Sequence, residues 1–227
     1  MFPLQRSIPF PPIRLERLAK YLQEVVQRGS VELDELKREG VDFGKGKGDI
    51  TRFLERLGLV SVSGKTAAPT KLAYEVLSMY RIIGNAAFHP LFYAVLLQYR
   101  LLSDIMRDLR VASIDELHEA LNKRVAEISP SSWINNVAFR SLVAIAVDIG
   151  LLGKKGKTLE YLGDPVSRAL ASAANGALIG KSAYMEEVPE WLKDCVKVRK
   201  PLGVVELDPE CTSRVLERRI LGLMVDK

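Results

Sequence analysis

Apolar residues recur at helical spacing through the first third of the chain. Between the prolines of residues 9–12 and Gly29, they occupy Ile13, Leu15, Leu18, Leu22, Val25 and Val26. A spacing of three to four residues places these side chains on one face of a helix. The same spacing predicts helices over residues 31–39 and 49–57, the first capped by Ser30 and the second by Asp49.

The pattern then changes from helical to alternating. Leu59, Val60 and Val62 precede a turn at residues 63–64, which predicts a small β-hairpin over residues 59–69. Helical spacing resumes over residues 70–83. The first third of the chain therefore reads helix, helix, helix, hairpin, helix.

The second part of the chain repeats this order. A long helix is expected over residues 89–110, with Pro90 at its start. Ser113 and Glu116 form a capping-box sequence before a helix that ends near residue 128. A third helix over residues 130–149, a hairpin over residues 151–163 and a helix from Pro165 complete the repeat.

Two short matches support an internal duplication. The sequence SVELDEL at residue 30 parallels SIDELHEAL at residue 113, and RLGLVSVSGKT at residue 56 parallels DIGLLGKKGKT at residue 148. We expect a mainly α protein with small β-hairpin wings. It would contain an extended arm and two units, followed by an extension with a strand and a terminal amphipathic helix; the boundaries are 1–12, 13–88, 89–180 and 181–227.

This order of elements resembles the winged helix-turn-helix superfamily, over residues 13–83 and 89–170. The resemblance implies that the third helix of each unit enters a DNA major groove and that the hairpin wing touches the backbone. In the first unit it implies DNA contacts from residues around the helix at 49–57: Lys45, Lys47, Thr51, Arg52, Arg56 and, at the wing tip, Lys65.

In the second unit, the resemblance implies DNA contacts from the third helix at 130–149 and from a wing without acidic residues. The helix supplies Ser131, Ser132, Asn135, Asn136 and Arg140, and the wing supplies Lys154, Lys155 and Lys157. Residues 133–149 are strongly apolar, which also fits a protein partner or a homodimer. Tandem winged helices similar to the accessory subunit of the bacterial chromosome-segregation complex work largely through protein contacts.

Composition allows nucleic-acid binding without establishing it. The chain has 227 residues, a net charge of +5 and a pI of about 9.2. Two glycine-rich stretches fail as nucleotide loops. Residues 44–49 have Asp49 where a dinucleotide fingerprint needs its last glycine, and residues 150–158 follow a helix where a phosphate loop needs a strand.

Candidate chemistry is sparse. His89 and His118 are the only histidines. Apart from Asp115 and Glu119 beside His118, neither has a carboxylate or cysteine at metal-ligand spacing, and neither is expected to act as a general base. His89 is expected to be a helix-start residue. Cys195 and Cys211 are expected to be free thiols in a reducing compartment. We expect no enzyme activity, no cofactor, no metal and no membrane span in this cytoplasmic protein.

The sequence therefore predicts a protein that binds double-stranded DNA, as a transcriptional or chromosome-associated factor. The alternative is a scaffold subunit that uses its winged helices for protein contacts. A homodimer or another partner would then bind through residues 133–149 or through the helix at 212–224.

Overall fold

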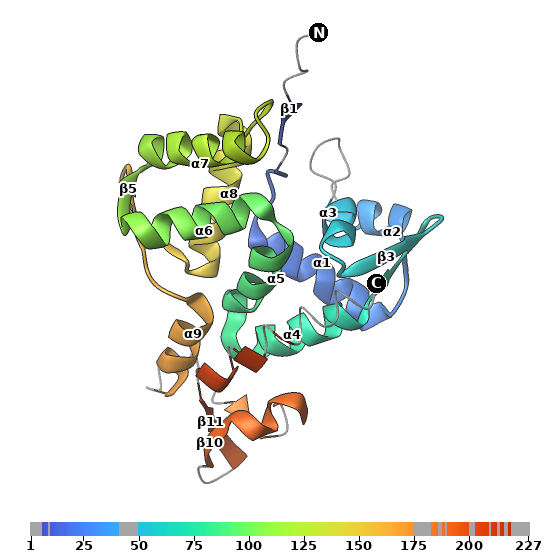
Figure 1. Cartoon of the computed structure of the whole chain (residues 1–227). Helices are drawn as coiled ribbons and strands as arrows, with labels where there is room; N and C mark the ends of the chain where they lie inside the picture. The colour runs from blue at the N-terminus through green and yellow to red at the C-terminus, as the bar shows by residue number, and fades with distance from the viewer. Residues whose placement is uncertain are drawn as a thin grey trace.

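Helices make up most of the protein, and short strands join into small sheets (Figure 1). The computed structural model describes residues 6–8, 10–40, 50–174, 183–185, 188, 190–199, 203–208, 210–212, 214–215 and 218. The mainly α fold class with small hairpins is therefore confirmed.

The first half of the chain contains a three-stranded antiparallel sheet with the order β2-β4-β3. Val31 pairs with Ala67, and Ala67 also pairs with Val62 across the hairpin. The hairpin predicted at residues 59–69 is confirmed. The elements are α1 (Leu15–Arg28), β2 (Val31–Glu32), α2 (Leu33–Arg38), α3 (Ile50–Arg56), β3 (Val60–Ser63), β4 (Thr66–Pro69) and α4 (Lys71–Ile83).

The second half has the same order of elements around a sheet with the order β5-β8-β7. Among the described residues, the second half differs in this order by a short strand between its second and third helices. The elements are α6 (Leu97–Leu109), β5 (Val111–Ser113), α7 (Ile114–Ile128), β6 (Ser132–Trp133), α8 (Asn136–Ile149), β7 (Leu152–Lys155), β8 (Thr158–Tyr161) and α9 (Pro165–Ala174). The hairpin predicted at 151–163 is confirmed.

The long helix predicted over residues 89–110 is wrong. A 3₁₀ turn, η2 (Gly84–Ala87), leads into α5 (Phe88–Val95), and the chain then bends at Leu96 before α6 begins. Leu96 has extended backbone angles, φ −103° and ψ 101°, and its side chain is buried. Its carbonyl accepts hydrogen bonds from the N–H groups of Tyr99 and Arg100, both at 3.0 Å. The residues at the bend include neither proline nor glycine, and the buried Leu96 side chain anchors the bend in the core.

The start of α2 also differs from the prediction. Ser30 does not cap this helix, because Val31 and Glu32 form a strand and Glu32 occupies the N-cap position. By contrast, Ser113 caps α7 as predicted: its hydroxyl accepts from the Glu116 N–H, and the Glu116 carboxylate accepts from the Ser113 N–H. The helix predicted over 130–149 begins at Asn136 instead, since residues 132–133 form β6.

One connected apolar core runs through both halves and reaches the C-terminal segment. A series of edge-to-face aromatic contacts crosses it. Phe10 packs on Phe53 of α3, Phe53 on Phe92 of α5, and Phe92 on Tyr99 of α6, with ring centroids 5.6, 6.2 and 5.7 Å apart. These rings bind the segment before α1, the first half and the second half to each other.

Residues before α1 also form a parallel pairing with the second half (Figure 1). β1 (Arg6–Ser7) lies beside β6, with Arg6 opposite Ser132 and Ser7 opposite Trp133. The Ile8 N–H donates to the Trp133 carbonyl over 2.7 Å. No pattern in the sequence predicts this pairing.

The C-terminal segment contains its own small sheet with the order β10-β11-β9. The strand predicted within residues 181–227 is confirmed as β11 (Val204–Leu207); β9 (Ala183–Tyr184), the 3₁₀ helix η3 (Glu190–Cys195) and β10 (Val196–Arg199) were not predicted. Cys195 and Cys211 form a disulfide, so the prediction of free thiols is wrong. Most of the helix predicted at 212–224 lies outside the described residues.

Candidate nucleic-acid interface

A groove runs between α3 and the β3–β4 hairpin in the first half of the protein. Ile50, Phe53 and Leu54 bury the inward face of α3 and so hold the helix at this edge of the core. The groove has a volume of about 380 Å³. Its lining residues are Leu33, Lys37, Thr51, Arg52, Glu55, Val62 and Gly64.

Arg52 and Arg56 lie on the exposed side of α3, together with Glu55. Residues four apart in a helix share one face, so the two arginines project in similar directions. Thr51 was predicted on this face, and that prediction is wrong. Its side chain is only 4% exposed, and its Oγ1 lies 2.6 Å from the Tyr21 hydroxyl of α1. Thr51 fixes α3 to α1.

The tip of the hairpin carries a cation beside the groove. Lys65 is 83% exposed, and its Nζ lies 4.0 Å from the Asp34 carboxylate of α2. The same carboxylate lies 3.8 Å from Lys37. Exposed ion pairs of this kind contribute only about 0–1 kcal/mol to stability. A phosphate group can therefore compete with the Asp34 carboxylate for Lys37 and Lys65. Lys45 and Lys47 precede α3 but lie outside the described residues.

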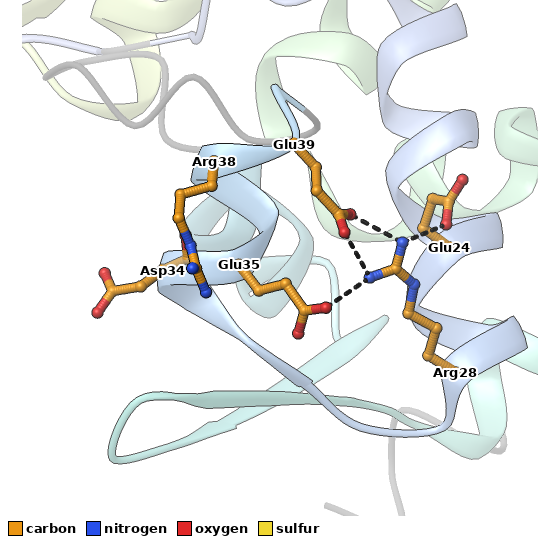
Figure 2. A network of polar contacts seen from close by, with 6 residues as sticks. All are labelled: Glu24, Arg28, Asp34, Glu35, Arg38 and Glu39. Atoms are coloured by element: carbon orange, nitrogen blue, oxygen red, sulfur yellow. Dashed lines mark hydrogen bonds and ion pairs between the residues drawn. The ribbon is translucent and has the colours of Figure 1, made fainter.

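The acidic residues of α2 and of its C-cap point in two directions (Figure 2). Glu35 and Glu39 point toward Arg28 at the end of α1, whereas Asp34 points away from it. The Arg28 guanidinium lies 3.2 Å from the Glu35 carboxylate and 2.8 Å from that of Glu39, and Glu24 lies 3.3 Å away on α1. The hydrogen bond to Glu39 raises the pKa of Arg28. The carboxylates of Glu35 on α2 and of Glu39 directly after α2 are thus directed to α1.

A second groove occupies the corresponding place in the second half. It lies between α8 and the β7–β8 hairpin and has a volume of about 360 Å³. Ile114 lines it as the first residue of α7, as Leu33 does for α2 in the first groove. Its lining residues are Arg14, Ile114, Phe139, Arg140, Val143, Ala144, Val147, Asp148 and Lys154.

The polar residues predicted in the second half have mixed roles. Asn136, Arg140, Lys154, Lys155 and Lys157 are exposed. Asn135, although exposed, serves the fold: its Oδ1 accepts from the Ala138 N–H over 2.9 Å, and its Nδ2 donates to the Ser7 hydroxyl over 2.8 Å. Ser131 and Ser132 precede α8 instead of lying in it. The sequence could reveal the cap but not the contact with Ser7.

Neither histidine belongs to these grooves. His89, expected only as a helix-start residue, is largely buried in the first turn of α5. Its Nδ1 lies 2.9 Å from the Tyr99 hydroxyl, and its Nε2 lies 3.6 Å from the Asp164 carboxylate. The ring of His118 stacks on Phe139, and its Nε2 lies 2.7 Å from the Ile134 carbonyl oxygen. Both histidines make contacts that join elements of the fold.

The described part of the chain holds no cluster of three His, Cys, Asp or Glu side chains that could bind a metal ion. Within the same residues, no helix has both the length and the apolar character needed to cross a bilayer. No protein-family model, curated protein or solved structure matches the chain.

Proposed function

We propose that the protein binds double-stranded DNA through tandem winged-helix units, followed by a C-terminal extension. The observation that carries this proposal is the position of Arg52 and Arg56 on the exposed face of α3, beside a hairpin with a lysine at its tip. The element order of each half, with a three-stranded sheet closed by the hairpin, supports the same proposal. A transcriptional or chromosome-associated role fits such a protein.

In the proposed complex, α3 lies in the major groove and the hairpin lies over the sugar–phosphate backbone. Arginine can donate two hydrogen bonds to one guanine, and such a pair is worth about 1–3 kcal/mol of discrimination against the wrong base. Arg52 and Arg56 are therefore the base-reading candidates. Lys37 and Lys65 would contact phosphates, as would Lys45 and Lys47.

The test is fluorescence anisotropy with a labelled random-sequence duplex at several salt concentrations between about 50 and 200 mM. The full chain should lose affinity steeply as salt rises, because each phosphate contact releases counterions. The double variant Arg52→Ala/Arg56→Ala should bind at least about tenfold more weakly, which corresponds to about 1.4 kcal/mol.

Lys123→Ala/Arg124→Ala is the charge-matched control, since it also removes two positive charges and both residues are exposed on α7, away from the first groove. It should bind DNA like the unmodified chain. Absence of binding by the full chain at 50 mM salt, or equal affinity in the double arginine variant, would contradict the proposal.

A second candidate function is a scaffold subunit that binds protein. Leu109 and Val111 are about half exposed and flank Arg110 at the junction of α6 and β5. The corresponding residues of the first half, Arg28 and Ser30, are polar. If the full chain binds no DNA and Leu109→Ser/Val111→Ser disrupts an oligomer seen by light scattering, the scaffold function is favoured.

A further inference from the structure

The wall that α8 contributes to the second groove consists of two neighbouring rows of side chains. Within each row, the residues are four positions apart along the helix. The rows are Phe139, Val143 and Val147, and Arg140, Ala144 and Asp148. Rows of this spacing form the ridges of a helix surface, and packed helices place the ridges of one into the grooves of the other. The wall therefore has the relief of a helix-packing surface.

The apolar side chains of this wall are only partly covered. Phe139 and Val143 are buried and form a floor, whereas Ala144 and Val147 are partly buried. Ile114, the first residue of α7, adds another apolar side chain to the lining. The distance between packed helices depends on the side chains at the contact, so the small side chain of Ala144 allows a close approach.

The first groove has a different lining. There, α3 contributes the polar residues Thr51, Arg52 and Glu55. The base edges of DNA present mainly hydrogen-bond donors and acceptors, which polar side chains can read. In the second groove, α8 instead places apolar side chains between Arg140 and Asp148. The two grooves therefore suit different ligands.

An exposed valine extends the apolar surface to the beginning of α8. Val137 is 65% exposed and lies seven residues before Ala144, which puts both residues on one face of the helix. In a helix that reads DNA, the N-terminal residues contact base edges. Valine has no side-chain hydrogen-bonding group, and exposed apolar surface of this kind marks a contact with another protein.

The charged residues of the second groove leave a positive excess. Arg14 lies 3.8 Å from Asp148, so these two charges balance. Arg140 and Lys154 are both exposed, and no carboxylate of the described residues forms an ion pair with either. Asp148 is the only carboxylate among the lining residues. A ligand that complements the groove therefore carries negative charge at the border of an apolar face.

We propose that the second groove binds an acidic amphipathic helix of a partner protein. The apolar side chains of that helix lie between the two rows of α8, as in other complexes in which a helix occupies a groove. Its carboxylates pair with Arg140 and Lys154. This inference goes beyond the proposed function, which assigns the DNA contacts to α3 and the first hairpin. The first half then holds DNA, and the second half holds the partner.

Charge also distinguishes this occupant from segments of the same chain. The predicted helix at 212–224 contains three arginines and one glutamate, so the positive groove disfavours it. A second copy of the chain would bring a net charge of +5 to the groove. An acidic helix from a different protein is the occupant that the charges favour.

The test uses a fluorescein-labelled synthetic helix as the probe. The acidic probe has about 18 residues, with leucine at positions i, i+3, i+4 and i+7, glutamate beside the leucines and alanine elsewhere. The matched basic probe has lysine in place of every glutamate. In anisotropy titrations, the full chain should bind the acidic probe at least about tenfold more tightly than the basic probe.

Charge reversal tests whether the second groove is the site. In Arg140→Glu/Lys154→Glu the preference should invert, so that the basic probe binds more tightly than the acidic one. Unfolding cannot produce this inversion, because it would weaken both probes. Val137→Ser should weaken both probes to the same extent, since the two share one apolar face. Lys123→Glu/Arg124→Glu, a charge-matched control on α7, should keep the original preference.

Three results would overturn the inference: no binding of the acidic probe at about 100 μM protein, equal affinity for both probes, or an unchanged preference in the reversed variant. A loss of DNA affinity in Arg140→Ala/Lys154→Ala would also overturn it, because the groove would then be a DNA surface. Arg52→Ala/Arg56→Ala should bind the acidic probe like the unmodified chain. A failure of the proposed function at α3 is therefore distinguishable from a failure of this inference.

Discussion

Thr51 shows how the position of one residue on a helix decides between core and surface. Successive residues of an α-helix are rotated by about 100°, so Thr51 lies only about 60° from Leu54 around the axis of α3. That side of α3 faces α1, where the Tyr21 hydroxyl meets the Thr51 oxygen. The Thr51 hydroxyl is the hydrogen-bond partner of the buried Tyr21 hydroxyl, and the Thr51 side chain borders the groove without sharing the exposed face of Arg52 and Arg56.

We predict that Thr51→Val lowers the free energy of unfolding by about 1–2 kcal/mol, because it removes one partner of a buried hydrogen bond. DNA affinity should be unchanged. Urea unfolding of Thr51→Val, Tyr21→Phe and the double variant provides the measurement. The double variant should lose less stability than the sum of the single variants, and strict additivity would contradict a direct interaction.

The two halves also differ in the residue that ends their first helix. Gly29 ends α1 with φ 75°, whereas Arg110 ends α6 with φ 66°. A left-handed conformation is easy for glycine and uncommon for arginine. The Arg110 guanidinium lies 5.6 Å from the centre of the Tyr161 ring, and the Arg110 carbonyl accepts from the Tyr161 N–H over 2.7 Å. These contacts to β8 hold the residue in place.

At the scale of elements, sequence patterns predicted the structure correctly where the interacting residues are close together in the chain. The capping box of Ser113 and Glu116 and both hairpins were predicted correctly, because their residues are close in the sequence. The strands β2 and β5 were missed, since two or three residues are too few to show an alternating pattern. The bend at Leu96 and the pairing of Ser7 with Trp133 depend on distant residues and leave no local signal.

The same reasoning applies to the candidate interface. Helical spacing was enough to place Arg52 and Arg56 outside, because Phe53 and Leu54 define the inward side of α3. It could not show that Asn135 is engaged by Ser7, or that Glu35 and Glu39 turn toward Arg28. Those contacts depend on which elements pack together.

His89 joins three elements in the middle of the protein. It lies on α5, contacts Tyr99 of α6, and faces Asp164 immediately before α9. Burial lowers the pKa of His89 to about 4, although the nearby Asp164 carboxylate acts in the opposite direction. Asp164 also accepts from the Ser167 N–H and so caps α9. A neutral imidazole therefore belongs to the folded protein.

We predict a loss of stability as the pH falls from about 6.5 to about 4, because the unfolded chain takes up a proton at His89 that the folded chain excludes. The difference in pKa corresponds to about 3 kcal/mol at most. Above pH 6.5 the contribution of His89 to stability is complete.

Urea unfolding between pH 4 and 8 measures this dependence. His89→Gln, which does not titrate, should be less stable at neutral pH and should show a weaker pH dependence. His118→Gln is the control. An identical pH dependence in His89→Gln and the unmodified chain would contradict the assignment.

At the scale of the whole molecule, the disulfide between Cys195 and Cys211 closes a covalent loop within the C-terminal segment. Cys195 ends η3 and Cys211 lies 16 residues later, beyond β10 and β11. Leu192, Val205 and Leu207 of this segment are buried in the common core. A loop of this size stabilises a fold by about 3 kcal/mol when its ends are joined, in the chain-entropy description.

We predict that dithiothreitol lowers the melting temperature of the protein and increases proteolysis between residues 183 and 218. The physical reason is the larger conformational entropy of the unfolded reduced chain. The double variant Cys195→Ser/Cys211→Ser should melt at the temperature of the reduced protein and be insensitive to dithiothreitol. A reductant effect of equal size in that variant would contradict the prediction.

The contact between Ser7 and Asn135 joins residues 128 positions apart. During synthesis, the strand β1 leaves the ribosome long before its partner strand β6 exists, and it stays unpaired until nearly three fifths of the chain has been made. Closing so long a loop is also entropically costly. The pairing of β1 with β6 should therefore be among the last steps of folding. A nascent chain that ends within α7 would carry a completed first half whose N-terminal strand still lacks its partner.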